Sequence, residues 1–306
     1  MASLKEVAQS GRYVVHEQIG AGALGRFFLS RAIGEGGFAK LVVVKQLHPH
    51  LAGRTDAVAA LLVDAQTMAR VHHANVLSPI DIVVDGPGTL VIMEYVHGAP
   101  LSVLLQLSRD REREVPPSIA SSIALDALTG FTALHEAAGP SIGARTVRPH
   151  HILVGTDGLA RLGGLGENGG PLAEGGLPGV LSLSGTPFGG SVATWSLVVA
   201  MWELFTGAQL DDATASHLLG RLRPGMSTGS SPLDHGADLL EKVVKRAVYA
   251  AHEPLLSSQD LSAALEAAVA PAAPSAVGGW VRSLAKNYLR ERRALINRVE
   301  LAYPTP

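Results

Sequence analysis

The chain has 306 residues, which is long enough for one large domain or for two lobes around a buried core. Hydrophobic residues make up 47% and charged residues 17%, so a wholly disordered chain is excluded. The 25 Lys and Arg residues nearly balance the 27 Asp and Glu residues, and this net charge of −2 argues against a dedicated nucleic-acid binder. The absence of cysteine excludes disulfides and thiol catalysis and is typical of a reducing compartment, so we expect a cytoplasmic protein.

We expect no targeting or membrane-spanning segment. Residues 1–10 include Lys5 and Glu6 and lack the apolar stretch of a signal peptide. The strongest apolar run, residues 197–202, ends at Glu203 and is far shorter than the ~18–20 residues that a spanning helix needs.

The first 96 residues indicate a small twisted sheet with one helix. β-Branched and aromatic residues lie between glycine-rich turns, a pattern typical of hairpins, and predict strands at residues 13–15, 26–29 and 41–44. A helix is predicted over residues 55–71, where Thr55 or Asp56 can cap its start. Further strands are predicted over residues 76–84 and 90–95.

The second part of the chain is mainly helical. Two prolines at 116 and 117 open a predicted helix that reaches Ala138, and a short hairpin follows over residues 152–162. The glycine-rich residues 163–190 show no period and predict a long loop. The remaining predicted helices cover residues 191–205, 234–249, 258–269 and 277–299.

Five motifs resemble segments of protein kinases. Residues 19–25 (Ile-Gly-Ala-Gly-Ala-Leu-Gly) resemble the glycine-rich loop, and residues 42–45 (Val-Val-Val-Lys) resemble the strand that carries the kinase lysine. Residues 73–76 resemble the segment after the regulatory helix, and residues 93–96 resemble the hinge. Residues 195–207 resemble the buried central helix of the large lobe.

The resemblance covers roughly residues 12–270 and is to bacterial Ser/Thr protein kinases of the type common in myxobacteria. It implies an α+β, two-lobed protein-kinase-like fold with a β-rich N-lobe, a mainly helical C-lobe and a C-terminal helical extension. The implied organisation is a tail over residues 1–11, an N-lobe over 12–96, a C-lobe over 97–270, and a linker with the helical extension over 271–306.

The residues that carry out phosphoryl transfer in the family are replaced in this chain. Where the family has the catalytic Asp, the metal-binding Asn and the metal-binding Asp, this chain has Thr146, His151 and Gly164. A threonine does not accept a proton as a carboxylate does, and magnesium prefers oxygen ligands to imidazole. The resemblance therefore implies a pseudokinase that has no catalytic residues and no metal ligands.

A vestigial nucleotide site remains in the same alignment. Its members match family positions that contact the nucleotide or the kinase lysine: Gly20, Gly22, Gly25, Lys45, Asp64, Glu94, Val96 and Leu153. Asp64 stands where the family has the lysine's glutamate and is one methylene shorter. Lys45 could therefore pair with Asp64, or it could be a solvated or loosely paired lysine, and the sequence leaves both alternatives open.

The sequence also predicts a smaller pocket for the nucleotide base and a weaker attachment of the catalytic loop. Phe27 and Val43 stand where the family has small residues that contact the base, and we interpret Phe27 as filling the empty slot. Ala193 stands where the family has the Asp that ties the central helix to the catalytic loop. Because no carboxylate or arginine replaces that Asp, we expect the support of the loop to be lost.

Three other signals have simpler interpretations. The histidine pairs at residues 72–73 and 150–151 could suggest a metal site. Neighbouring residues on a strand point to opposite faces, so each pair offers at most one ligand. We therefore interpret them as ordinary loop or surface histidines. The charged run over residues 109–114 predicts a solvated loop. The last helix carries six basic residues and an apolar stripe, and it is interpreted as packing on the large lobe with its arginines in water, or alternatively as a docking helix for an acidic or helical partner.

We therefore expect a catalytically inactive domain that binds or scaffolds proteins in bacterial signalling or assembly, with no cofactor. The partner would be a protein of unknown identity, bound at the helix near Asp64, at residues 163–190 or at the C-terminal helix. The alternative is a switch that binds ATP weakly without a metal, or a Ser/Thr kinase with residual transfer through Glu167 or Asp157.

Overall fold

The computed structural model describes residues 12–22, 24–85, 88–139, 146–163, 191–221, 235–250 and 256–302. The described residues form two compact units. The small unit takes the described residues within Met1–His72, Leu77–His97 and Lys286–Pro306, and the large unit takes those within His73–Val76 and Gly98–Ala285.

The small unit is built on a five-stranded antiparallel sheet with the strand order β1-β2-β3-β5-β4. Its elements are β1 (Tyr13–Ala21), β2 (Gly25–Ile33), the short 3₁₀ helix η1 (Glu35–Gly37), β3 (Ala39–Leu47), α1 (Pro49–Ala52), α2 (Thr55–Ala69), β4 (Pro79–Asp85) and β5 (Gly88–Glu94). Val42 and Val44 of β3 are fully buried, and together with Tyr13, Leu90 and Ile92 they form the core of the sheet. Val42 and Val44 are two positions apart, so their side chains point to the same face of the sheet.

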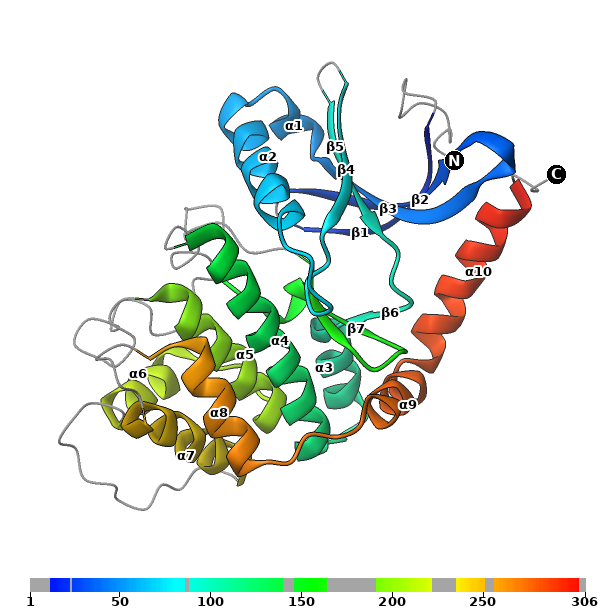
Figure 1. Cartoon of the computed structure of the whole chain (residues 1–306). Coiled ribbons are helices and arrows are strands. Elements are labelled where there is room, and N and C mark those ends of the chain that lie inside the picture. Colours follow the sequence, from blue (N-terminus) through cyan, green and yellow to red (C-terminus); the bar gives the residue numbers. More distant parts are fainter. Residues whose placement is uncertain are drawn as a thin grey trace. The chain divides into compact units, whose positions relative to one another are not determined.

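Helix α2 packs beside strand β4 of this sheet (Figure 1). Its buried residues are spaced for one helical face: Ala57, Leu61, Ala65 and Met68. An apolar stripe of this spacing is what holds a helix on a sheet, because the opposite face can remain polar. The predicted helix over residues 55–71 is therefore confirmed, ending two residues earlier at Ala69.

The large unit is mainly helical and includes a three-stranded sheet with the order β6-β7-β8. Its elements are β6 (Gly98–Pro100), α3 (Leu101–Asp110), α4 (Pro117–Ala138), the 3₁₀ helix η3 (Pro149–His151), β7 (Ile152–Gly155), β8 (Ala160–Leu162), α5 (Val192–Thr206), α6 (Asp212–Arg221), α7 (His235–Ala250), α8 (Ser258–Ala268) and α9 (Pro274–Leu284). Helices α4, α5, α7 and α8 pack on one another (Figure 1). Helix α5 is apolar on all sides and nearly all of it is buried, with Trp195 at 0% exposure.

The predicted solvated loop over residues 109–114 is wrong at its start. Arg109 and Asp110 form the last turn of α3, and Arg109 donates a hydrogen bond to the carbonyl oxygen of Gly207 at 3.2 Å. The apolar spacing of Leu101, Leu104 and Leu105 produces this helix, because all three side chains are buried on one face.

The predicted single helix over residues 277–299 is two helices in the structure. Helix α9 ends at Leu284, and α10 (Lys286–Ala302) begins after Ala285. Helix α9 belongs to the large unit, with Val277 and Val281 buried, whereas α10 belongs to the small unit. The expectation that the apolar stripe packs on the large lobe therefore holds for α9 and is wrong for α10.

Candidate functional site

The glycine-rich turn between β1 and β2 is closed by its own backbone. The Gly22 N–H donates to the carbonyl oxygen of Gly25 at 2.8 Å. Gly25 is buried so tightly against β3 that a Cβ on it would lie 2.2 Å from the carbonyl oxygen of Gln46. His48 fixes the other side of the turn, because its Nε2–H lies 2.8 Å from the carbonyl oxygen of Gly22 and its backbone N–H donates to Leu24. Gly20 and Gly22 themselves are exposed.

The ring of Phe27 lies against this turn. Phe27 on β2 pairs in register with Lys45 on β3, and the Lys45 Nζ lies 5.9 Å from the centroid of the ring, a cation–π contact. A Cβ on Gly20 would lie 3.9 Å from the Phe27 Cδ2, and a Cβ on Gly22 would lie 3.8 Å from the Cε2. An aromatic ring thus occupies volume between the two exposed glycines and the lysine.

Lys45 and Asp64 lie on different elements of the small unit, strand β3 and helix α2, and both side chains are half-buried. Lys45 also pairs in register with Val91 of β5, which fixes the strand that carries it. The direct pairing of Lys45 with Asp64 stays a prediction.

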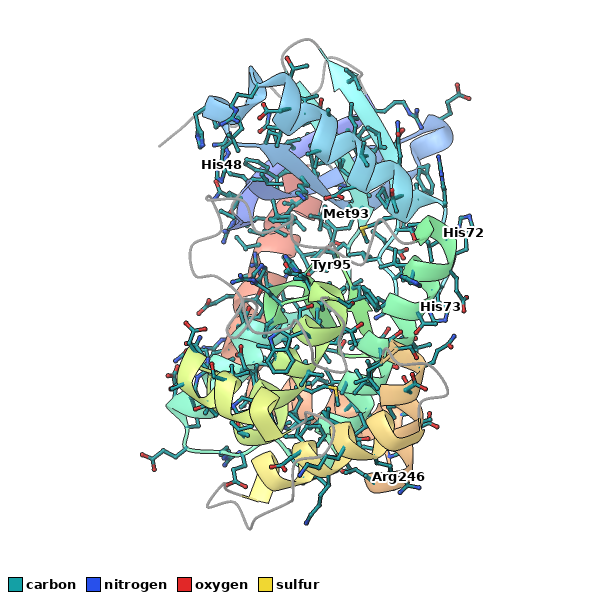
Figure 2. All side chains as sticks on the ribbon, turned by 90° about the vertical axis from the view of Figure 1, so that its left-hand side faces the viewer. His48, His72, His73, Met93, Tyr95 and Arg246 are labelled. Atoms are coloured by element: carbon teal, nitrogen blue, oxygen red, sulfur yellow. The ribbon has the colours of Figure 1, made fainter. Side chains whose placement is uncertain are left out.

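The acidic side chain of the segment that resembles a hinge forms an ion pair. Glu94 is exposed at the end of β5, and its Oε1 lies 2.7 Å from the Nζ of Lys40. Tyr95 and Val96 are half-buried, and burial is the main cause that raises the pKa of Tyr95 above its ordinary value. Figure 2 labels Tyr95 and the buried Met93 of β5. Recognition of a base by the backbone of residues 94–96 stays a prediction.

The catalytic-loop segment of the large unit places Thr146 and Val147 in buried positions. The backbone N–H of Val147 donates to the Ser196 Oγ at 2.7 Å, and this hydroxyl donates to the carbonyl oxygen of Ala193 at 2.7 Å. Ser196 on α5 therefore ties this loop to the buried helix. The expectation that the loop lost its support with the change to Ala193 was wrong, because a hydroxyl one turn further along α5 makes the tie.

His151 is held by its own loop. Its Nδ1 accepts a hydrogen bond from the backbone N–H of Arg148 at 3.2 Å, and its ring packs edge-on against His150 at a centroid distance of 4.1 Å. In a neutral imidazole one nitrogen accepts and the other carries the hydrogen. Because Nδ1 accepts in this arrangement, the hydrogen of a neutral His151 ring lies on Nε2. Burial lowers the pKa of His150, which favours its neutral form.

Two predicted site positions remain, Leu153 and Gly164. Leu153 is half-buried on β7 while its neighbours Ile152 and Val154 are buried, so its side chain lies on the opposite face from theirs. Gly164 lies outside the described residues, as do Glu167 and most of residues 163–190.

The carboxylates near the catalytic loop are engaged in structural contacts. Asp157, considered above as an atypical catalytic group, forms a two-point ion pair with Arg161 at 2.6 and 3.2 Å, and the hydrogen bond from Arg161 holds the pKa of Asp157 below its ordinary value. A carboxylate with a lowered pKa is a weaker general base.

The sequence interpretation missed Asp126, a carboxylate on α4. Its Oδ2 accepts the backbone N–H of Ala160 at 2.7 Å, and Asn75 donates to the carbonyl oxygen of the same residue at 2.9 Å. Desolvation by burial raises the pKa of Asp126. Asp126 and Asn75 together fix strand β8 from two sides. An acidic residue in the middle of the apolar α4 was the signal that could have revealed it.

Within the described residues, no group of three or more His, Asp or Glu side chains is placed to hold a metal ion. His72 and His73 follow one another on the loop after α2 (Figure 2), and the Nδ1 of His73 accepts the backbone N–H of Asn75 at 3.1 Å. None of the described helices is both long and apolar enough to cross a bilayer.

Comparison with curated proteins finds similar kinases. The chain is 31% identical over 153 residues to the serine/threonine-protein kinase PkaB of Streptomyces coelicolor, which covers 50% of this chain and 34% of PkaB. It is 28% identical over 126 residues to the tyrosine-protein kinase MasK of Myxococcus xanthus, which covers 41% of this chain and 20% of MasK. The chain thus spans about a third or less of the length of these relatives.

Comparison with solved structures supports the fold. The Mycobacterium tuberculosis PknI kinase domain matches with a TM-score of 0.58 and 19% sequence identity, covering 84% of this chain and 95% of that domain. At this identity the likeness shows the fold alone. The family model described as protein kinase domain matches residues 13–167, which is just over half of the chain. The α+β fold of a five-stranded small unit and a helical large unit is thereby confirmed as a kinase fold, and the chain belongs to the protein kinase domain family.

Proposed function

We propose that this chain is a pseudokinase, a kinase-fold domain that does not transfer phosphate and acts by binding other proteins. The observation that carries the proposal is the catalytic loop. Thr146 is buried where the family needs a carboxylate, and His151 has a metal-ligand position but uses Nδ1 within the loop. Magnesium held by oxygen ligands is central to phosphoryl transfer, so a loop without them lacks the main source of charge neutralisation.

The small unit supports the same proposal independently. Phe27 places an aromatic ring beside the two exposed glycines and the Lys45 ammonium, where a nucleotide would need room. Adding volume to a packed site typically costs about 1–3 kcal/mol, and here a ligand would have to displace the ring. The cation–π contact adds about 0.5–1 kcal/mol that the displacement would forfeit.

The inferred role as a protein-binding or scaffolding module in bacterial signalling follows by elimination. The supports of the fold remain intact: Ser196 holds the catalytic loop, and Asp126 with Asn75 holds β8. A chain that keeps the kinase fold but lacks the reactive groups presents surfaces rather than chemistry. No cofactor is needed for that role.

The experiment is a thermal-shift titration of the chain with ATP, once with magnesium and once with EDTA. A ligand that binds only the folded state stabilises it by about 2.7 kcal/mol at a hundred times its Kd, so true binding is easy to see. We expect no shift that depends on magnesium. A magnesium-dependent shift that saturates with ATP would contradict the proposal.

A second candidate function, a metal-independent nucleotide switch, is favoured by the exposed Gly20 and Gly22 and by the retained Lys45. The variant Phe27→Val separates it from the first candidate. If the ring is the obstacle, adenosine shifts the melting temperature of Phe27→Val and leaves the parent unchanged. A shift of the parent by ATP in EDTA, weakened by Lys45→Met, would instead establish the switch.

A further inference from the structure

Helix α10 lies within the small unit and contacts its edge strand. The sheet order places β1 at one edge, with β2 as its partner, so one side of β1 has no neighbouring strand in the sheet. An edge strand presents unpaired backbone groups that proteins commonly cover. Residues of α10 reach two positions of β1, Glu17 and Ile19, directly before the exposed Gly20.

The part of β1 that α10 reaches is irregular. The pairing of β1 with β2 shifts in register between Val15 and Gln18 and again between Gln18 and Gly20. Such irregularities disrupt the ladder of backbone hydrogen bonds locally. The stretch that leads into the glycine-rich turn is therefore less constrained by β2 than the strand's first residues are.

Arg292 supplies a contact for this stretch. Its guanidinium donates to the carbonyl oxygen of Ile19 and, at 3.0 Å, to the hydroxyl of Tyr288 one turn earlier on α10. The same guanidinium lies 5.0 Å from the centroid of the Tyr288 ring. Two hydrogen bonds and a cation–π contact hold the charge in place, so the backbone contact is made by a pre-oriented group.

Arg298 supplies the second contact, six residues further along the helix. Its Nε and Nη2 donate to the two carboxylate oxygens of Glu17, each at 2.9 Å. The paired geometry fixes direction as well as distance. Leu289, before Arg292, and Val299, directly after Arg298, are buried apolar residues of the same helix.

Helix α9 is attached in a different way. A Cβ on Gly278 of α9 would lie 2.3 Å from the carbonyl oxygen of Thr156, and one on Gly158 would lie 1.8 Å from the carbonyl oxygen of Pro274. Helix α9 thus packs closely on the backbone of the large unit, and its Arg282 also donates to the carbonyl oxygen of Thr156 at 2.6 Å. Helix α10, by contrast, contacts β1 through two arginines, while Lys286 and Arg290 on it are exposed.

We propose that α10 is a clamp on β1 that fixes the position of the glycine-rich turn. When α10 is docked, Arg292 and Arg298 hold Glu17 and Ile19, and the turn rests on Phe27. Without the two arginine contacts, the irregular part of β1 would be held less firmly and the turn could open more easily. The clamp does not depend on whether the chain binds a nucleotide.

The test is hydrogen exchange of the full chain, read on peptides that cover residues 13–22. Arg292→Gln removes a charged hydrogen bond to a backbone carbonyl, and we expect exchange there to accelerate about tenfold. Arg298→Gln removes a half-exposed ion pair, and we expect about a threefold acceleration. Arg290→Gln, an exposed arginine on the same helix, is the matched control and should leave exchange unchanged.

Exchanging the charges of Glu17 and Arg298 tests the ion pair even if one of the single variants folds poorly. Glu17→Arg alone and Arg298→Glu alone should each lose protection, and the two together should restore it to within about twofold of the parent, because the ion pair is rebuilt in reverse. Peptides of α2 and β5 should stay unchanged throughout.

Three results would overturn the clamp. One is unchanged exchange of residues 13–22 in both Arg292→Gln and Arg298→Gln. Another is acceleration spread evenly over the whole sheet, which would make α10 a general support. The third is a charge-exchanged chain that remains as unprotected as its single variants.

Discussion

The glycine-rich face of the small unit and the catalytic loop of the large unit depart from an active kinase in opposite ways. The small unit keeps Gly20, Gly22 and Lys45, but the ring of Phe27 takes up the volume beside them. The large unit keeps the supports of its loop, through Ser196, but replaces the reactive side chains with Thr146 and His151. The proposed pseudokinase role thus rests on a filled volume in one region and on replaced side chains in the other.

The difference teaches that the proposal has two independent parts, which can be tested separately. Removing the ring from the small unit would provide space without a metal ligand, and restoring a carboxylate at position 146 would provide a base without a nucleotide. In both regions some residues hold the backbone, as Gly25 does in the small unit and Ser196 in the large unit, and their loss should cost stability rather than activity. The following predictions separate backbone roles from vestigial ones.

The largest effect is expected from the glycines of the small unit. Gly25→Ala should lower the free energy of unfolding by about 2–3 kcal/mol, because its Cβ would lie 2.2 Å from the Gln46 carbonyl oxygen and the backbone would have to shift. Gly22→Ala, in the same motif, meets nothing closer than 3.8 Å and should change stability by less than about 0.5 kcal/mol. Urea unfolding measures both, and equal effects would contradict the structural role given to Gly25.

An intermediate effect is expected from the tie of the catalytic loop. Ser196→Ala leaves the buried N–H of Val147 without its acceptor, which should cost about 1.5 kcal/mol. Ser216→Ala, at an exposed position of α6, is the control and should be neutral. If calorimetry gives Ser196→Ala the same melting temperature as the parent, the loop is held by something other than this hydroxyl.

The smallest effect is a pH dependence that comes from Asp126. Because burial raises its folded-state pKa above the unfolded value, Asp126 stabilises the fold below the unfolded pKa of about 3.9, and this contribution is lost as the pH rises through the folded pKa. Asp126→Asn keeps an oxygen for the Ala160 N–H but does not titrate.

The variant should therefore gain stability relative to the parent as the pH rises from about 4 towards neutrality, a window that starts at the reference pKa of aspartate. Melting temperatures of both chains across that range measure the difference. A difference that stays constant with pH would show that the Asp126 carboxyl titrates as it does in the unfolded chain.

The sequence allowed the fold to be predicted, because glycine turns, strand alternation and helical stripes are local signals. The stripe of Leu101, Leu104 and Leu105 is such a signal for α3. The charged residues 109–114 that follow it favour a loop, and they hid the end of this helix. The division between α9 and α10 had no local signal, because Ala285 is a good helix former and the break follows from packing in two different units.

The site residues that sequence reasoning missed act through tertiary contacts. Ser196 lies one turn from the family's Asp position, and only the folded chain shows that its hydroxyl reaches Val147. In the sequence, Asp126 is an acidic residue within an apolar helix, and its role is evident only from its hydrogen bond with Ala160 of β8. The docking of Arg292 and Arg298 on β1 joins residues more than 270 positions apart, which no periodicity reports.

The most direct test of the central claim is a phosphate-transfer measurement. The purified chain is incubated with magnesium and ATP, alone and with a generic protein substrate, and phosphate on either protein is counted by intact-mass spectrometry. The account predicts no phosphate above a control without the chain. Phosphate that appears with the parent and disappears with Lys45→Met would contradict it.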